Sequence, residues 1–63
     1  MANFIKLHKD KIPVWINMEL VTRIDYIEND ETFHAHLDFH DDTLEEEVDE
    51  TPDMIVKLAE MAK

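Results

Sequence analysis

The sequence predicts a small α+β domain, either an antiparallel five-stranded meander or a partly closed barrel, with one C-terminal helix. Short segments in which apolar and polar residues alternate, separated by turn residues, indicate half-buried strands. A Thr-Pro-Asp sequence at 51–53 is typical of a helix start. With 63 residues the chain has room for a single domain over 1–63, and its core must be thin.

The first two strands are expected on either side of a turn at residues 10–11. Apolar and polar residues alternate over 5–8 and again over 13–16. A turn at 10–11 places the apolar side chains of both strands on one face and puts Lys6 opposite Trp15 on the outer face. Because residues 13–16 begin with a proline, which lacks an amide proton, this strand belongs at an edge of the sheet.

The middle of the chain predicts a short helical turn and two further strands. Asn17 is a suitable N-cap for a turn at 18–20, after which the chain extends again over 21–28. The Asn-Asp pair at 29–30 forms the next turn, since both residue types tolerate left-handed backbone conformations. The clearest strand is Thr32–His40, which has apolar residues on one face and histidine or aspartate on the other.

A fifth strand and the helix complete the predicted fold. With a turn at 41–42, residues 44–48 form a strand that contributes Leu44 and Val48 to the core. Glu46 lies on the same face, so this strand is expected at an edge, where an inward charge discourages aggregation. The helix after the Thr-Pro-Asp sequence is expected to reach the C-terminus, with an apolar stripe that covers one face of the sheet.

The composition excludes several classes of function. Cysteine, glycine and serine are all absent. Disulfides, thiolate metal sites, glycine-rich phosphate loops and serine nucleophiles are therefore excluded. Residues 1–11 contain no apolar run long enough for a signal peptide or a membrane span, so the protein is predicted to be cytoplasmic and not to bind membranes.

Charge is distributed very unevenly along the chain. The net charge is −10, yet residues 1–24 carry a balance of +2. Residues 25–53 contain 13 acids and no lysine or arginine. Such an acidic segment repels nucleic acid and anionic membranes and favours cations or basic partners. Direct binding to nucleic acid is therefore not expected.

The polar face of the Thr32–His40 strand carries the best candidate metal ligands. His34 and His36 lie about 6.7 Å apart on one face of an extended strand, close enough to bind one ion. The predicted turns place Asp25 opposite His34 and Glu47 opposite His36. These four residues would suit Zn²⁺ or a similar ion. The alternative is an outward face on which acids pair with partly protonated histidines and make them sensitive to pH.

Trp15 is the candidate anchor of a protein interface. Tyr26 and most of the methionines are expected in the core, but the strand pattern places Trp15 outside, beside Lys6. Tryptophan is enriched at the centres of interfaces, and the predicted edge strand with Glu46 and Val48 offers a second surface for pairing. The alternative for Trp15 is a ring shielded by the Lys6 stem through cation–π contact.

The order of elements and several short matches resemble the FlbD-type small proteins associated with flagella and swarming. The matching residues are Ile5-Lys6-Leu7, Ile16-Asn17, Leu20-Val21 and Ile24, followed by a C-terminal helix. The sequence departs from that family in its acidic segment, in its glycine-free turns and in its Thr-Pro-Asp helix start. The resemblance implies a fold and a bacterial motility context, without a mechanism.

These observations predict a small acidic module for protein interaction or assembly that self-associates or docks onto a larger assembly. No enzyme activity, catalytic residue, cofactor or small-molecule substrate is expected, because no nucleophile or positioned base stands out. The alternatives are an acidic decoy of a nucleic-acid-binding protein, as in some phage proteins, and a metal-binding protein that uses His34 and His36.

Overall fold

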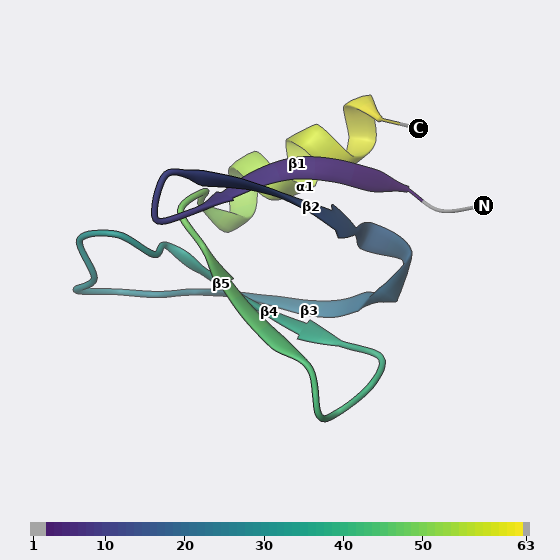
Figure 1. Ribbon diagram of the computed structural model, residues 1–63, viewed down its shortest axis with the longest axis horizontal. Coiled ribbons are helices and arrows are strands. Elements are labelled where there is room, and N and C mark those ends of the chain that lie inside the picture. Colours follow the sequence, from purple (N-terminus) through teal and green to yellow (C-terminus); the bar gives the residue numbers. More distant parts are fainter. Residues whose placement is uncertain (1–2, 63) are drawn as a thin grey trace.

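The computed structural model describes residues 3–62 and has the predicted order of elements (Figure 1). The elements are β1 (Phe4–Lys9), β2 (Ile12–Asn17), the 3₁₀ turn η1 (Met18–Leu20), β3 (Val21–Tyr26), β4 (Ala35–Phe39), β5 (Glu45–Val48) and α1 (Pro52–Met61). The α+β class with antiparallel strands and one C-terminal helix is confirmed. The strands form two sheets, β1-β2 and β3-β4-β5, instead of one meander, and within 3–62 they close no barrel.

The β1–β2 hairpin has the register that the alternation predicts. Leu7 pairs with Val14, and Lys6 pairs with Trp15. The turn residues Asp10 and Lys11 have φ values of 51° and 70°, which is costly for residues with a Cβ atom. The carboxylate of Asp49 offsets this cost by accepting hydrogen bonds from both turn amides, at 2.9 and 2.8 Å.

The turn η1 separates the two sheets. Its N-cap is Asn17, as predicted, and the Asn17 side chain accepts hydrogen bonds from the amides of Glu19 and Asn3, each at 3.1 Å. At the other end of the turn, the Leu20 carbonyl accepts from the His40 amide at 2.7 Å. The chain therefore leaves the hairpin at η1 and enters a second layer, which explains why β2 and β3 do not pair.

In the second sheet, one predicted register is right and the other is wrong by two residues. His36 pairs with Glu47 on β5, as predicted. On the other side it pairs with Asp25, which was expected opposite His34. Because the shift is even from Arg23 to Tyr26, the side chains of this part of β3 keep their faces, while a bulge between Val21 and Arg23 changes the register at the start of the strand.

The register differs because the β3–β4 connection is longer than the predicted two-residue turn. Asn29 adopts a left-handed conformation with φ 63°. The Asp30 carboxylate then accepts hydrogen bonds from the amides of Thr32 and Phe33, both at 2.8 Å. Strand β4 consequently begins at Ala35 and not at Thr32.

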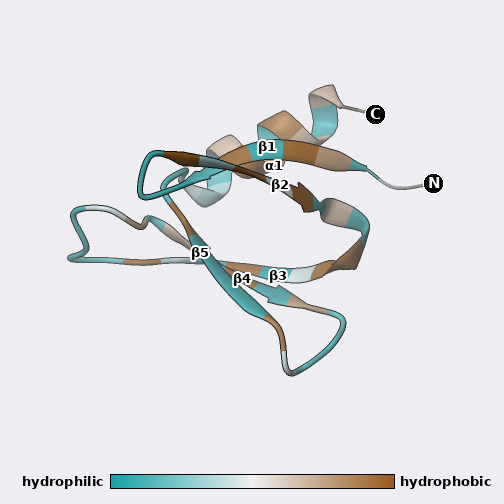
Figure 2. Ribbon diagram, viewed as in Figure 1, coloured by the Kyte–Doolittle hydropathy of each residue, from teal (hydrophilic) through white to brown (hydrophobic). Residues whose placement is uncertain are grey.

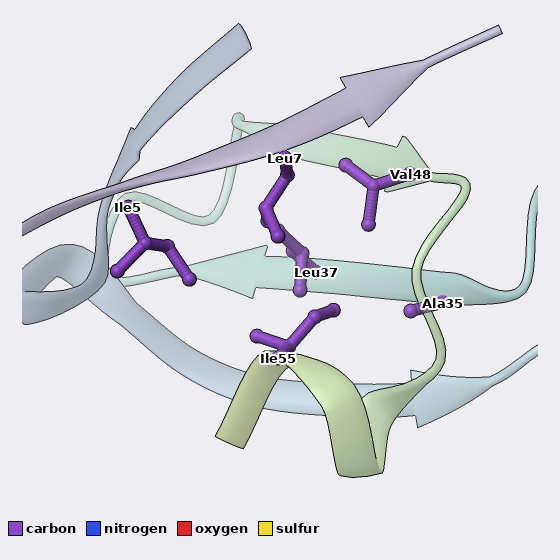
Figure 3. Packing of buried hydrophobic residues seen from close by; sticks show 6 residues of the cluster. All are labelled: Ile5, Leu7, Ala35, Leu37, Val48 and Ile55. Atoms are coloured by element: carbon purple, nitrogen blue, oxygen red, sulfur yellow. The ribbon is translucent and has the colours of Figure 1, made fainter. Parts of the chain in front are cut away.

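A small core joins both sheets to the helix (Figure 3). Six hydrophobic residues of the described chain are buried: Ile5, Leu7, Ala35, Leu37, Val48 and Ile55. Figure 3 shows Ile55 of α1 pointing towards Leu37 of β4, with Leu7 of β1 on the other side. Each layer supplies a few side chains, so none of them can bury its apolar face alone.

The helix begins as predicted but buries less than predicted. Thr51 is its N-cap and accepts a hydrogen bond from the Met54 amide at 3.3 Å. Of the expected apolar stripe only Ile55 is buried, while Met54 and Met61 are 48% and 73% exposed. Tyr26, also expected in the core, is exposed as well. Within residues 3–62 no helix is long and apolar enough to cross a membrane.

Candidate functional site

An apolar groove of about 200 Å³ lies between the two sheets. Its lining comes from β2, η1, the end of β4, the turn before β5 and the start of β5: Trp15, Ile16, Asn17, Leu20, Phe39, Leu44, Glu45 and Glu46. We call it the Trp15 groove. Apolar side chains form most of it, and Glu45 and Glu46 add an acidic rim. Figure 2 shows the same contrast, since β2 is largely hydrophobic and most of β5 is hydrophilic.

Three large apolar side chains of the groove are exposed to solvent. Trp15, Leu20 and Leu44 are 61%, 49% and 53% exposed. Leu44 was expected in the core, but it precedes β5 in a turn in which its amide donates to the Asp41 carbonyl at 3.0 Å. Exposed apolar residues that cluster in this way are typical of interaction surfaces.

Trp15 lies where the alternation predicts. Its side chain is on the outer face of the hairpin, and the Lys6 ammonium is 5.9 Å from the centroid of its ring. This geometry fits the predicted cation–π contact. The contact leaves more than half of the Trp15 side chain in solvent, so it does not by itself account for the exposed ring.

The backbone of Trp15 faces a free edge. On β1, the His8 amide donates to Glu50 Oε1 at 2.9 Å and the His8 carbonyl accepts from the Asp49 amide at 2.8 Å, so both groups point away from β2. Backbone groups alternate in direction along antiparallel strands. Pro13, the partner of His8, and Trp15, two residues further on, therefore point their backbone groups away from β1. Within residues 3–62, β2 has β1 as its only neighbour in the sheet.

The other predicted interface residues are divided between surface and core. Glu46 lies on the rim of the groove and forms an ion pair with Lys9 at 2.7 Å. Val48 is 1% exposed, so its side chain is not available to a partner. The predicted surface thus keeps Trp15, Lys6 and Glu46, and it gains Leu20 and Leu44.

The second candidate site is centred on His36, on the outer face of the β3-β4-β5 sheet. Nε2 of His36 lies 3.1 Å from Asp38 Oδ1 and 3.3 Å from Glu45 Oε1, and Nδ1 lies 3.7 Å from Glu47 Oε2. Asp25 pairs with His36 on the neighbouring strand. Two of the predicted ligands, Asp25 and Glu47, therefore flank His36, while Asp38 and Glu45 face its Nε2 atom.

His34 is not part of this cluster. Its Nδ1 atom lies 2.8 Å from the carbonyl oxygen of Asp49, to which it donates a hydrogen bond. Within residues 3–62, the one group of three side chains with potential ligand atoms close together is His36, Asp38 and Glu45, and these atoms lie within 4.8 Å of one another. His34 and His36, which the strand pattern predicts as ligands of one ion, therefore have different partners in the structure.

The carboxylates determine the charge state of His36. Partial burial of the ring lowers its pKa, but the hydrogen bond from His36 to Asp38 and the charges of Asp38 and Glu45 outweigh this effect. The pKa of His36 is therefore raised above its ordinary value of 6.5. Asp38 and Glu45 could have been found from the sequence, since Asp38 is two residues from His36 and the correctly predicted β4–β5 register pairs it with Glu45.

Comparison of the chain with models of protein families, with curated proteins and with solved structures finds no match. The resemblance to the FlbD-type proteins stays a prediction. The Trp15 groove and the His36 cluster are therefore the two features of the molecule that indicate a function.

Proposed function

We propose that this protein is a small non-enzymatic interaction module that self-associates through the free edge of β2 and the Trp15 groove beside it. The observation that carries the proposal is the backbone of Trp15, which faces away from β1 next to an exposed apolar surface. An extended segment can pair with such an edge through backbone hydrogen bonds and place side chains in the adjoining groove.

The charge distribution favours a second copy as the partner. Strand β2 contains no charged residue, and residues 1–24 carry a balance of +2. Two β2 edges can therefore approach each other without bringing the acidic segments face to face. Glu45 on the rim of the groove attracts the lysine-bearing hairpin of another copy more than its acidic sheet, whereas Glu46 on the same rim is already paired with Lys9 of its own hairpin.

The thin core means that self-association would add stability to the fold. A domain of this size gains little stability from its own core, and a partner subunit is a common way to complete it. Burial of the large ring of Trp15 against a second copy would contribute more than any other exposed side chain of β2. The absence of cysteine fits the reducing compartment of the predicted cytoplasmic location.

The test is the absolute mass in solution, measured by light scattering after size exclusion at low micromolar concentration and physiological salt. We expect the wild type to be a dimer. Trp15→Pro removes the outward amide and the ring together and should give a monomer, and Trp15→Thr, which keeps a good strand former, should weaken the dimer. Tyr26→Ser is the matched control, because Tyr26 is 60% exposed on a different strand.

Two results would contradict the proposal. One is a wild type that is monomeric throughout this concentration range. The other is equal weakening of the dimer by Trp15→Thr and Tyr26→Ser, which would place the interface elsewhere. Amide NMR spectra of each variant show whether it keeps the wild-type fold, so that loss of the dimer is not confused with unfolding.

A second candidate function, an acidic decoy that binds a basic nucleic-acid-binding protein, is supported by a different surface. Asp25, Asp38, Glu45 and Glu47 lie around His36 on the outer face of the three-stranded sheet. Binding to a basic DNA-binding domain that persists at physiological salt would support this function. Binding that disappears there would be nonspecific attraction and would count against it.

A further inference from the structure

We propose that His36, Asp38 and Glu45 form a binding site for a divalent transition-metal ion of the Zn²⁺ class. The site lies on the outer face of the β3-β4-β5 sheet. It shares Glu45 with the rim of the Trp15 groove, but metal binding needs only one copy of the chain, so either proposal can fail without the other.

The sheet places the three side chains together. His36 and Asp38 are two residues apart on β4 and therefore project from the same face. Glu45 is the direct partner of Asp38 on β5. Three ligands from two hydrogen-bonded strands have fixed backbone positions, and such positions are more precise than those on a loop.

The distances match those between ligands of one ion. Asp38 Oδ1 and Glu45 Oε1 lie 3.1 and 3.3 Å from Nε2 of His36. With metal–ligand bonds of about 2.1 Å, neighbouring ligand atoms are about 3.0 Å apart in octahedral and about 3.4 Å apart in tetrahedral coordination. The carboxylate oxygens of Asp38 and Glu45 lie within 4.8 Å of each other. Small side-chain rotations would bring these two oxygens to the separation of neighbouring ligand atoms.

Both oxygens approach the same ring nitrogen. A single N–H group at Nε2 can point well at one of them only, whereas one metal ion would interact with the nitrogen and with both oxygens. Within residues 3–62, neither Asp38 nor Glu45 forms an ion pair with a lysine or arginine. The imidazole distinguishes this group from an ordinary solvated acidic surface, since it is the ligand that Zn²⁺ and related ions prefer over Ca²⁺ and Mg²⁺.

Glu47 lies beside the other ring nitrogen of His36. Its Oε2 atom is 3.7 Å from Nδ1, which is longer than a hydrogen bond. An ion that binds at Nε2 would displace the proton there, and the negative charge of Glu47 would favour a proton on Nδ1. Carboxylates commonly orient metal-binding histidines from this side. The three side chains leave the outer positions of the ion to water, because all of them reach the surface.

The experiment is isothermal titration calorimetry, in which Zn²⁺ is added to protein that has been treated with a chelator and then freed of it. We expect one ion per chain, and Asp38→Asn and Glu45→Gln should each weaken binding on the order of tenfold or more. Glu50→Gln is the matched control. It makes the same chemical change beside His8, whose Nδ1 lies 2.6 Å from a single carboxylate, and should leave the affinity unchanged. His34→Gln should also leave it unchanged.

A second readout identifies the residue. Co²⁺ is paramagnetic, and at substoichiometric amounts it should broaden the ring signals of His36 before those of the other histidines. The proposal is overturned if the wild type shows no saturable binding of Zn²⁺. It is also overturned if Glu45→Gln and Glu50→Gln weaken binding equally, or if His34→Gln abolishes binding while Glu45→Gln does not. Amide spectra of the metal-free variants exclude unfolding as the cause of any loss.

Discussion

At His36, one ring nitrogen faces two carboxylates, and the protonation of this ring changes the charge of the whole outer face of the sheet. The ionisable groups around the ring come from all three strands of its sheet and from β1: Arg23, Asp25, Asp38, Glu45, Glu46, Glu47 and Lys9. Both positively charged groups are paired, Arg23 with Asp25 at 3.0 Å and Lys9 with Glu46 at 2.7 Å. The protonated ring is therefore surrounded mainly by negative charge.

This environment predicts a pH dependence of stability in the metal-free protein. Because the pKa of folded His36 is above 6.5, its protonation stabilises the fold fully below that value, and the stabilisation is lost as the pH rises through the folded pKa. In EDTA, the free energy of unfolding should therefore fall as the pH is raised above about 6.5. The fall should be smaller in His36→Gln. Urea unfolding of both proteins checks this, and equal slopes would show that His36 does not contribute.

The histidines also show what a sequence pattern can and cannot predict about a site. Alternation correctly placed His36 on the outer face with Glu47 beside it. It could not reveal that His34 turns to a backbone carbonyl, since that contact depends on the path of the chain after β5. For this reason the predicted site of His34 and His36 with Asp25 and Glu47 is replaced by one histidine, His36, with the carboxylates of Asp38 and Glu45.

At the scale of elements, local signals predicted most of the secondary structure. The N-caps Asn17 and Thr51 and the hairpin register of β1 and β2 follow from residues close together in sequence. The β3–β4 register depends on a side-chain contact. The Asp30 carboxylate accepts hydrogen bonds from two loop amides, and the loop is longer than the predicted turn. Hydrophobic alternation does not report such a contact.

The β1–β2 turn should depend strongly on Asp49. Its carboxylate is the acceptor for both turn amides, and the turn residues have left-handed conformations without glycine. Asp49→Ala should therefore lower the free energy of unfolding by about 1–3 kcal/mol. Asp42→Ala is the control, since it removes a similar charge from an exposed turn and should change stability by less than about 0.5 kcal/mol. Equal effects in urea unfolding would mean that Asp49 acts only through its charge.

At the scale of the whole molecule, the division into two sheets is the main feature that the sequence did not predict. A meander was expected because consecutive strands usually pair, but η1 directs β3 into a second layer. The Trp15 groove forms where the layers separate, from segments as far apart in the sequence as Trp15 and Glu46. Leu44 illustrates why such a groove is hard to predict. The alternation of apolar and polar residues predicts that Leu44 is buried in the core, but the turn before β5 leaves it exposed to solvent.

Self-association through β2 is the central claim, and hydrogen exchange of the Trp15 amide tests it most directly. This amide points away from β1, whereas the Val14 amide points towards Leu7 and is protected within one copy. Exchange followed by NMR at two protein concentrations should show the Trp15 amide slowing as concentration rises, while Val14 stays protected at both. A Trp15 amide that exchanges at the same fast rate at both concentrations would contradict pairing at this edge.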